Sequence, residues 1–328
     1  MPKTIVITGA ATTTERNDMS KTWLITGSSR GLGRALAREV LEAGHSLVAT
    51  ARRPEQLSEL VAEYGDRVRA VALDVTDEIA AQGAVQTAVA SFGRLDVVVN
   101  NAGYANTGPV EETSMQEFRS QIEADLFGVI SVTKAALPVL REQRSGHFVQ
   151  VSSVGGRVGG TPGIAPYQTA KFGVEGFSLA LRSEVAPLGI RVMIVEPGAL
   201  RTDWGGSSMH VADVGSDYQQ TVGLFHDYLR EADGNQPGDP ARAARVIRET
   251  VDLDEAPVRL LLGSDAVEQA EQAERSRAAE TKRWAQVGRS IDYGTSSELA
   301  RTPITQLLTS ARTPTRQHTL STTRKAGS

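Results

Sequence analysis

The feature that most constrains the fold is a short apolar run followed by three closely spaced glycines, between Thr22 and Gly33. The apolar run at 23–25 is typical of a strand, and Gly27, Gly31 and Gly33 lead into a segment with helical hydrophobic spacing. Glycine permits unusual backbone angles and lets backbone N–H groups approach a pyrophosphate. We therefore expect a strand, a phosphate-binding turn and a helix. A glycine turn without a ligand is the alternative, because the spacing is not the commonest dinucleotide-binding pattern.

Strand-like and helix-like hydrophobic spacings then alternate along the chain. We expect strands at 23–25, 47–50, 68–73, 96–100, 147–151, 191–195 and 258–262, and helices after Gly33 and at 55–64, 78–92, 115–140, 167–185 and 265–284. Strands that alternate with helices predict an α/β fold with a doubly wound parallel sheet of about seven strands. The pattern needs no domain boundary between residues 20 and 293, so we expect a single domain.

Three segments stand apart from this pattern. Residues 1–18 contain a second copy of the first strand without its glycines, and we interpret them as an appended extension, with an extra edge strand as the alternative. The main domain should span 19–293, and its weakly patterned segment at 204–236 is long enough to suggest a lid over a ligand site. Residues 294–328 are polar and basic, and we expect a disordered tail there.

Composition excludes several classes of function. The formal net charge of −4 over 328 residues gives no electrostatic footprint for nucleic acid. The absence of cysteine excludes disulfides and thiolate metal sites, and five scattered histidines lack ligand spacing, so we expect no metal. No apolar run is long enough to span a membrane, and no secretion signal begins the chain. We expect a cytoplasmic protein.

Candidate catalytic residues follow the strand at 147–151. Ser152 and Ser153 end this strand, and Tyr167 and Lys171 lie one helical turn apart at the start of the next long helix. A tyrosine is a poor acid or base at neutral pH, but a nearby ammonium lowers its pKa, and a serine hydroxyl can hold a substrate oxygen. A surface tyrosine and lysine on an amphipathic helix are the alternative interpretation.

The order of these motifs resembles the short-chain dehydrogenase/reductase family over residues 20–293. The resemblance implies a Rossmann-type fold, an NAD(P)(H) cofactor, and hydride transfer between the nicotinamide and an alcohol or carbonyl carbon. It assigns the catalytic roles to Ser153, Tyr167 and Lys171. Ser153 stands fourteen residues before Tyr167, one more than is usual, so the residues at 155–163 must absorb the difference, and Ser152 is the substitute candidate.

The resemblance also implies the cofactor contacts. Beyond Tyr167 and Lys171, the expected contacts come from the glycine turn, from the ends of two further strands and from the segment after 191–195: Gly27, Ser29, Arg30, Gly31, Leu32, Gly33, Asp74, Val75, Asn101, Ala102, Gly103, Pro197, Gly198 and Thr202. Asn and Gly at 100–103 are equally compatible with a simple turn.

Asp125 is a departure from the family pattern, which usually has asparagine there. In the family that residue is thought to hold a water of a proton relay through its backbone carbonyl. The carboxylate of Asp125 would add a charge near Lys171, or it would point away and cap a neighbouring loop.

The charge at the end of the second strand indicates the cofactor. An acid there would favour NAD(H), but the position is Ala51, followed by Arg52 and Arg53, and Arg30 lies in the glycine turn. Guanidiniums bind a 2′-phosphate well, so we expect NADP(H) rather than NAD(H). The resemblance further implies a small alcohol or ketone substrate and a homodimer or homotetramer. The alternative function is a non-catalytic nucleotide-binding regulator or scaffold.

Overall fold

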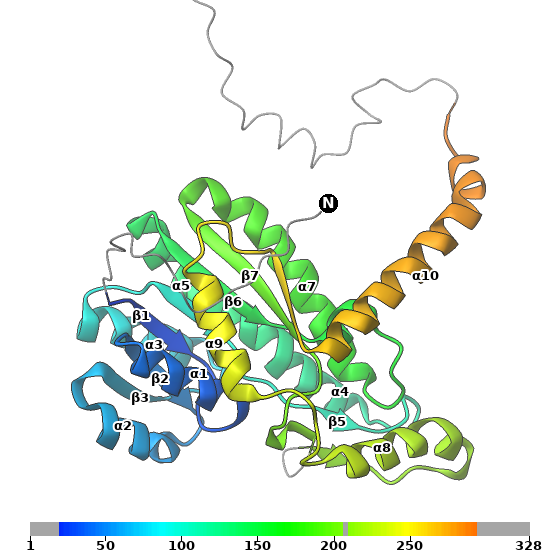
Figure 1. The fold of residues 1–328 in the computed structure, drawn as a ribbon, viewed down its shortest axis with the longest axis horizontal. Helices are drawn as coiled ribbons and strands as arrows, with labels where there is room; N and C mark the ends of the chain where they lie inside the picture. The colour runs from blue at the N-terminus through cyan, green and yellow to red at the C-terminus, as the bar shows by residue number, and fades with distance from the viewer. Residues whose placement is uncertain (1–19, 206–208, 294–328) are drawn as a thin grey trace, which may run out of the picture. The chain divides into compact units, whose positions relative to one another are not determined.

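The computed structural model describes residues 20–205 and 209–293 (Figure 1). The expected extension at 1–18 and the tail at 294–328 lie outside the described residues. The chain divides into one unit that ends at Glu274 and a second that begins at Arg275. The first unit contains the whole sheet. The second unit is described over 275–293 and contains the latter part of helix α10 (Ser264–Arg289).

Seven parallel strands form the central sheet, which confirms the predicted α/β, Rossmann-type fold. They are β1 (Thr22–Ile25), β2 (Ser46–Ala51), β3 (Val68–Ala72), β4 (Val97–Asn100), β6 (Gly146–Val151), β7 (Ile190–Pro197) and β9 (Arg259–Leu262). Their order is β3-β2-β1-β4-β6-β7-β9, so the direction of chain progression reverses between β1 and β4. Ligands of such sheets bind outside the carboxyl ends of the strands at this reversal.

Helices cover both faces of the sheet because successive side chains of each strand point to opposite sides. Trp23 and Ile25 of β1 pack with α1 (Gly31–Glu42), α2 (Ser58–Tyr64) and α9 (Pro240–Val251). Leu24 packs on the other face with α3 (Glu78–Phe92), α5 (Gly128–Gln143) and α7 (Ala165–Val185). Both faces of β1 are fully buried, so the strand that the short apolar run predicted is a central one.

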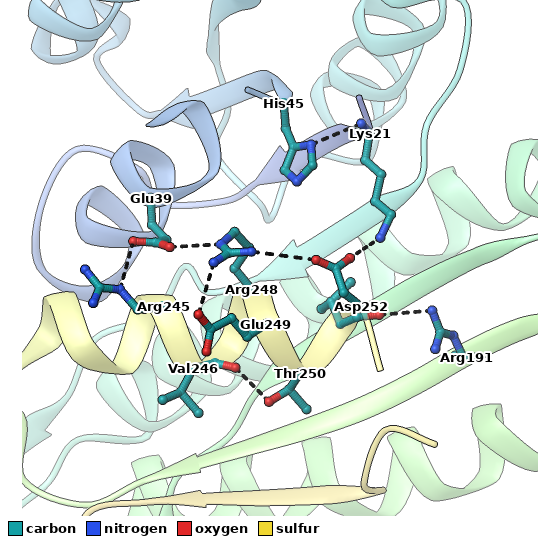
Figure 2. A network of polar contacts seen from close by, with 11 residues as sticks. Lys21, Glu39, His45, Arg191, Arg245, Val246, Arg248, Glu249, Thr250 and Asp252 are labelled. Atoms are coloured by element: carbon teal, nitrogen blue, oxygen red, sulfur yellow. Dashed lines mark hydrogen bonds and ion pairs between the residues drawn. The ribbon is translucent and has the colours of Figure 1, made fainter. Parts of the chain in front are cut away.

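A polar network on the α1 face fixes helix α9 (Figure 2). Arg248 Nε lies 2.8 Å from Glu39 Oε1 of α1, and its Nη1 lies 3.7 Å from Asp252 Oδ2 at the end of α9. Asp252 also pairs with Lys21, which directly precedes β1. The network therefore stabilises the amino edge of the sheet, away from the strand ends where a ligand is expected.

Two expected elements differ in detail. The helix expected at 115–140 is divided into α4 (Met115–Ile122), a π-helical turn η3 (Glu123–Phe127) and α5. The weakly patterned segment is more regular than its sequence suggests: β8 (His210–Val211) pairs with β5 (Asn106–Thr107), and a π-helical turn (Gln219–Gly223) leads into α8 (Leu224–Ala232). No helix among the described residues is long and apolar enough to cross a membrane.

Candidate active site

The glycine turn that connects β1 to α1 leaves very little space for side chains. Gly27 and Gly31 have φ of +68° and +55°, a region that favours glycine. A Cβ on Gly33 would lie 2.3 Å from the Gly27 carbonyl oxygen, so only glycine fits there. Arg30 occupies the N-cap position of α1 without a side-chain capping bond. The first N–H groups of α1 therefore have no capping side chain, as an anion site at a helix start requires.

Asn101 holds this turn against the end of β4. Its Nδ2 donates to the carbonyl oxygens of Thr26 at 2.9 Å and Gly27 at 3.2 Å. The Thr26 hydroxyl in turn accepts the backbone N–H groups of Asn101 and Ala102, both at 2.9 Å. The side chain of Asn101 is thus engaged in shaping the turn. The motif at 100–103 was equally compatible with a simple turn, and the place of Thr26 directly before the glycine turn did not indicate these bonds.

Ser153 and Tyr167 approach each other at the carboxyl end of β6. Ser153 caps the short helix α6 (Val154–Val158) by accepting the Gly155 N–H at 3.0 Å, and its hydroxyl lies within hydrogen-bonding reach of the Tyr167 phenol. The extra residue in the spacing is accommodated by α6 and by the glycines that follow it, three of which have positive φ: Gly159, Gly160 and Gly163. Ser152 instead lies against Gly156, whose Cβ would be 2.6 Å from the Ser152 hydroxyl oxygen.

Burial controls the protonation of Tyr167. The pKa of Tyr167 is raised well above 10 by burial, the nearby Asp125 carboxylate adds to the rise, and Ser153 opposes it. The expected lowering by the Lys171 ammonium does not offset this rise: Lys171 Nζ lies 5.6 Å from the centre of the phenol ring. Tyr167 therefore carries its proton at neutral pH, the state that a proton donor needs.

Lys171 lies one helical turn after Tyr167 on α7 and is itself buried, with an exposed fraction of 4%. Its ammonium donates to the Val151 carbonyl oxygen at 3.0 Å. Burial lowers the pKa of Lys171, and the Asp125 carboxylate opposes that change. The lysine is thus held by β6 and by an acid across the site.

Asp125 is fully buried in the π-helical turn η3. Its Oδ1 accepts the Tyr104 N–H at 3.0 Å, and burial raises the pKa of Asp125 to about 6 despite the nearby Lys171. A Cβ on Gly103 would lie 3.1 Å from Asp125 Oδ1 and 3.5 Å from Lys171 Nζ, so the two charged groups flank the same glycine. The carboxylate therefore combines the two alternatives: it caps the 103–105 loop and acts electrostatically on the lysine.

The arginines expected to bind a 2′-phosphate lie beyond the buried Ala51 at the end of β2. Arg30, Arg52 and Arg53 are exposed, and their side chains make no hydrogen bond or ion pair with other described residues. Arg52 lies near enough to Asp74 to contribute to the lowered pKa of that carboxyl, after the hydrogen bonds from Thr76. The neighbouring Val75 is buried against Gly128 of α5.

The segment after β7 approaches the glycine turn from the other side. Gly198 donates its N–H to Leu262 of β9 at 2.8 Å, and a Cβ on Gly198 would collide with the Asp265 carboxylate. Thr202 borders the turn, because a Cβ on Gly31 would lie 3.5 Å from the Thr202 Cβ. Pro197, Gly198 and Thr202 are therefore brought to the same edge of the sheet as the turn, Ser153, Tyr167 and Lys171.

A buried cluster of charges beside this segment was not expected from the sequence. Glu196, just before Pro197, is fully buried, and it pairs with Arg157 of α6 at 2.9 Å and Arg259 of β9 at 3.1 Å. Arg259 also pairs with the buried Glu175 of α7 at 2.9 Å. Burial and the neighbouring Glu175 raise the pKa of Glu196 to about 7. A glutamate at the end of an otherwise apolar strand was the signal that could have revealed it.

Comparison with known proteins is consistent with this geometry. The sequence model described as short chain dehydrogenase matches residues 21–210. The chain is 51% identical over 267 residues to Oxidoreductase BOA17 of Botryotinia fuckeliana, covering 81% of this chain and 97% of that protein.

Solved structures agree. A short-chain dehydrogenase from Streptomyces avermitilis has a TM-score of 0.78 and 41% identity, over 84% of this chain and 100% of that one. An alcohol dehydrogenase from the archaeon Thermococcus sibiricus, complexed with 5-hydroxy-NADP, has a TM-score of 0.61 and 28% identity, over 74% and 96% of the two chains. The chain therefore belongs to the short-chain dehydrogenase family of NAD(P)-dependent oxidoreductases.

Proposed function

We propose that this protein is an NADP(H)-dependent carbonyl reductase or alcohol dehydrogenase in which Tyr167 is the general acid for reduction and the general base for oxidation. The observation that carries the proposal is the arrangement of Ser153, Tyr167 and Lys171 at the carboxyl edge of the sheet, beside the glycine turn. Such an arrangement supplies one proton donor, one group that holds an oxygen and one fixed positive charge.

The residues around the turn fit a dinucleotide. Gly27 and Gly31 have positive φ, the start of α1 has no side-chain cap, and Arg52 and Arg53 are exposed at the end of β2. The turn from Gly27 to Gly33 would hold the pyrophosphate, the arginines would hold a 2′-phosphate, and Thr202 would lie near the nicotinamide. Bound NADPH would supply the hydride for reduction, and bound NADP⁺ would accept it in oxidation.

The chain's own residues supply the proton and its placement. Ser153 would donate a hydrogen bond to the substrate oxygen and orient it toward Tyr167. The Tyr167 hydroxyl would give its proton to that oxygen as the carbonyl carbon is reduced, and Lys171 would stabilise the phenolate that remains. Asp125 favours the charged form of Lys171 by opposing the effect of burial on the lysine pKa.

Replacement of Tyr167 by phenylalanine tests this proposal. We expect kcat for ketone reduction by NADPH to fall by at least about a thousandfold, because the placed proton donor is lost. NADPH binding, measured by fluorescence titration, should be retained. Turnover of the Tyr167→Phe variant close to wild type would contradict the assignment, and a wild-type protein that binds NADPH but reduces no carbonyl compound would favour a nucleotide-binding regulator.

A further inference from the structure

Tyr167 belongs to an apolar cluster that is separate from the two clusters on the faces of the sheet. We call this set the Tyr167 cluster. Its buried members besides Tyr167 are Ala105, Ile164 and Met209, and its half-buried members are Trp204, Phe225 and Leu229. These residues come from the segment before β5, the loop before α7, the connection after β7 and helix α8. Segments far apart in the sequence thus bring apolar side chains to the one phenol that the proposed reaction uses.

The ring of Trp204 packs against the ring of Tyr167. Its ring centre lies 5.2 Å from the Tyr167 ring centre, with the two planes tilted by 58°. The Trp204 backbone N–H donates to the Thr202 hydroxyl at 3.3 Å, and Thr202 borders Gly31 of the glycine turn. The indole is therefore held between the segment expected at the nicotinamide and the proton donor.

Helix α8 approaches the Tyr167 cluster at Gly163, where the lack of a side chain permits close contact. A Cβ on Gly163 would lie 3.0 Å from Val222 and 3.5 Å from Phe225, and the Gly163 carbonyl accepts the Gly108 N–H at 2.9 Å. The close approach brings Phe225, at the start of α8, beside the loop that leads to Tyr167. Phe225 in turn stacks with Tyr228, with ring centres 6.4 Å apart.

Charged side chains lie on both sides of this cluster, and on the α8 side Arg230 pairs with Asp227. Among the described residues, the Asp125 carboxylate raises the pKa of Tyr167, and the Lys171 ammonium is directed to Val151. The polar groups on the α8 side satisfy each other: the Thr107 hydroxyl and His226 Nε2 share a hydrogen bond of 2.7 Å. Burial lowers the pKa of His226, so this side chain is neutral at pH 7. The cluster itself thus contains no cation that could pair with a negatively charged substrate.

We propose that the substrate is an uncharged carbonyl compound, or the corresponding alcohol, with an aryl or medium-length alkyl group on the reacting carbon, and that Trp204 and Phe225 select it. The inference rests on the proposed function, because it names the substrate class of the Tyr167 site. An anionic substituent would lose its hydration without gaining a partner, whereas an apolar group gains from leaving water.

Matched pairs of ketones test the substrate class in the wild-type full chain with NADPH. 4′-Isopropylacetophenone and 4-acetylbenzoate differ by an isopropyl group in place of a carboxylate of similar shape, and 5-methyl-2-hexanone and 4-oxopentanoate form the equivalent aliphatic pair. We expect kcat/KM to be at least about a hundredfold lower for each carboxylate, the effect of an unpaired buried charge. In a series of 2-alkanones, each added buried methylene should raise kcat/KM about fourfold.

The outcomes separate the two proposals. Equal kcat/KM values for the carboxylates and for their apolar partners would overturn the substrate class and leave the reductase proposal intact. No turnover of either member of any pair would overturn the reductase proposal, and this inference with it.

Two variants test the selecting residues. Trp204→Ala should lower kcat/KM for 4′-isopropylacetophenone about tenfold more than for 2-butanone, because the small ketone does not reach the indole. Trp284→Ala, at an exposed tryptophan outside the cluster, is the matched control and should change neither value.

The test with Phe225→Arg does not require the variant to keep the full wild-type rate. It places a cation in the cluster, so the ratio of kcat/KM for 4-acetylbenzoate to that for 4′-isopropylacetophenone should rise at least about tenfold. Because the readout is a ratio measured on one protein sample, partial unfolding does not affect it. The proposed role of these residues would be overturned if neither variant changed its ratio of kcat/KM values: 4′-isopropylacetophenone to 2-butanone for Trp204→Ala, and 4-acetylbenzoate to 4′-isopropylacetophenone for Phe225→Arg.

Discussion

Replacing Gly33 by alanine tests how tightly the glycine turn is built. The added Cβ would lie 2.3 Å from the Gly27 carbonyl oxygen and 2.4 Å from Asn101 Nδ2. Neither atom can move freely, because Asn101 Nδ2 donates to the carbonyl oxygens of Thr26 and Gly27. Ordinary van der Waals contact of a Cβ begins at 3.4 Å, so the turn and α1 must separate by about 1 Å.

This separation has two measurable consequences. Overpacking of this kind costs about 1–3 kcal/mol in the free energy of unfolding. For a domain of this size we expect the melting temperature to fall by about 2–10 °C. The displaced N–H groups of the turn should also lower the affinity for NADPH at least about tenfold, which corresponds to one lost hydrogen bond to a charged group.

Gly83→Ala is the matched control. Gly83 lies inside helix α3, and a Cβ there would meet no atom within 4 Å. Alanine is favoured over glycine in a helix by up to about 1 kcal/mol, so this variant should melt at the wild-type temperature or higher and bind NADPH unchanged. Circular dichroism melting and fluorescence titration with NADPH measure both quantities. A Gly33→Ala variant that matches wild type in both would refute the argument from steric fit.

Three other perturbations have defined outcomes. Arg52→Ala should raise KM for NADPH at least about tenfold and leave KM for NADH nearly unchanged, because only a 2′-phosphate loses a charge-assisted contact; equal effects on the two cofactors would mean that Arg52 faces solvent. Because burial raises the pKa of Asp125 to about 6, the contribution of Asp125 to the stability of wild type is lost as pH rises from about 4 to 6, and Asp125→Asn removes this loss. Denaturation curves of the two proteins should therefore diverge in favour of Asp125→Asn across that window, and a constant difference would contradict the buried carboxylate. The expected homodimer or homotetramer is supported by exposed apolar side chains, Phe172 and Leu179 on α7 and Phe127 on η3; light scattering should give a multiple of the chain mass for wild type and a lower mass for Leu179→Glu, and a monomeric wild type would exclude the oligomer.

The sequence predicted the parts of the fold that depend on local pattern. The run at 23–25 is fully buried as β1, and the alternation of periods corresponds to seven parallel strands in one sheet. The parallel pairing follows from such a pattern because parallel strands need crossover connections, whereas the pattern itself does not give the strand order. The spacing of Tyr167 and Lys171 likewise predicted that they lie one helical turn apart. Both lie on α7 and are buried at the expected edge of the sheet.

Features that depend on contacts between distant segments could not be predicted. The bonds from Thr26 to Asn101 and Ala102 join the ends of two neighbouring strands, and the place of Thr26 before the glycine turn does not tell which residues it contacts. The π-helical turn that buries Asp125 has a hydrophobic pattern compatible with one continuous helix. The contact of Trp204 with Tyr167 requires the chain to return after β7, which no spacing rule describes.

Transfer of an isotopic label tests the central claim most directly. Wild-type protein should be mixed in a single turnover with 4′-isopropylacetophenone and NADPH that carries deuterium at C4, each C4 epimer in turn. We predict that one epimer delivers its deuterium to the carbinol carbon of the product in an amount equal to the NADP⁺ formed, and that Tyr167→Phe, although it binds NADPH, forms almost no labelled alcohol. NADP⁺ formed without label at the carbinol carbon, or equal labelled product from Tyr167→Phe, would contradict hydride transfer assisted by a proton from Tyr167.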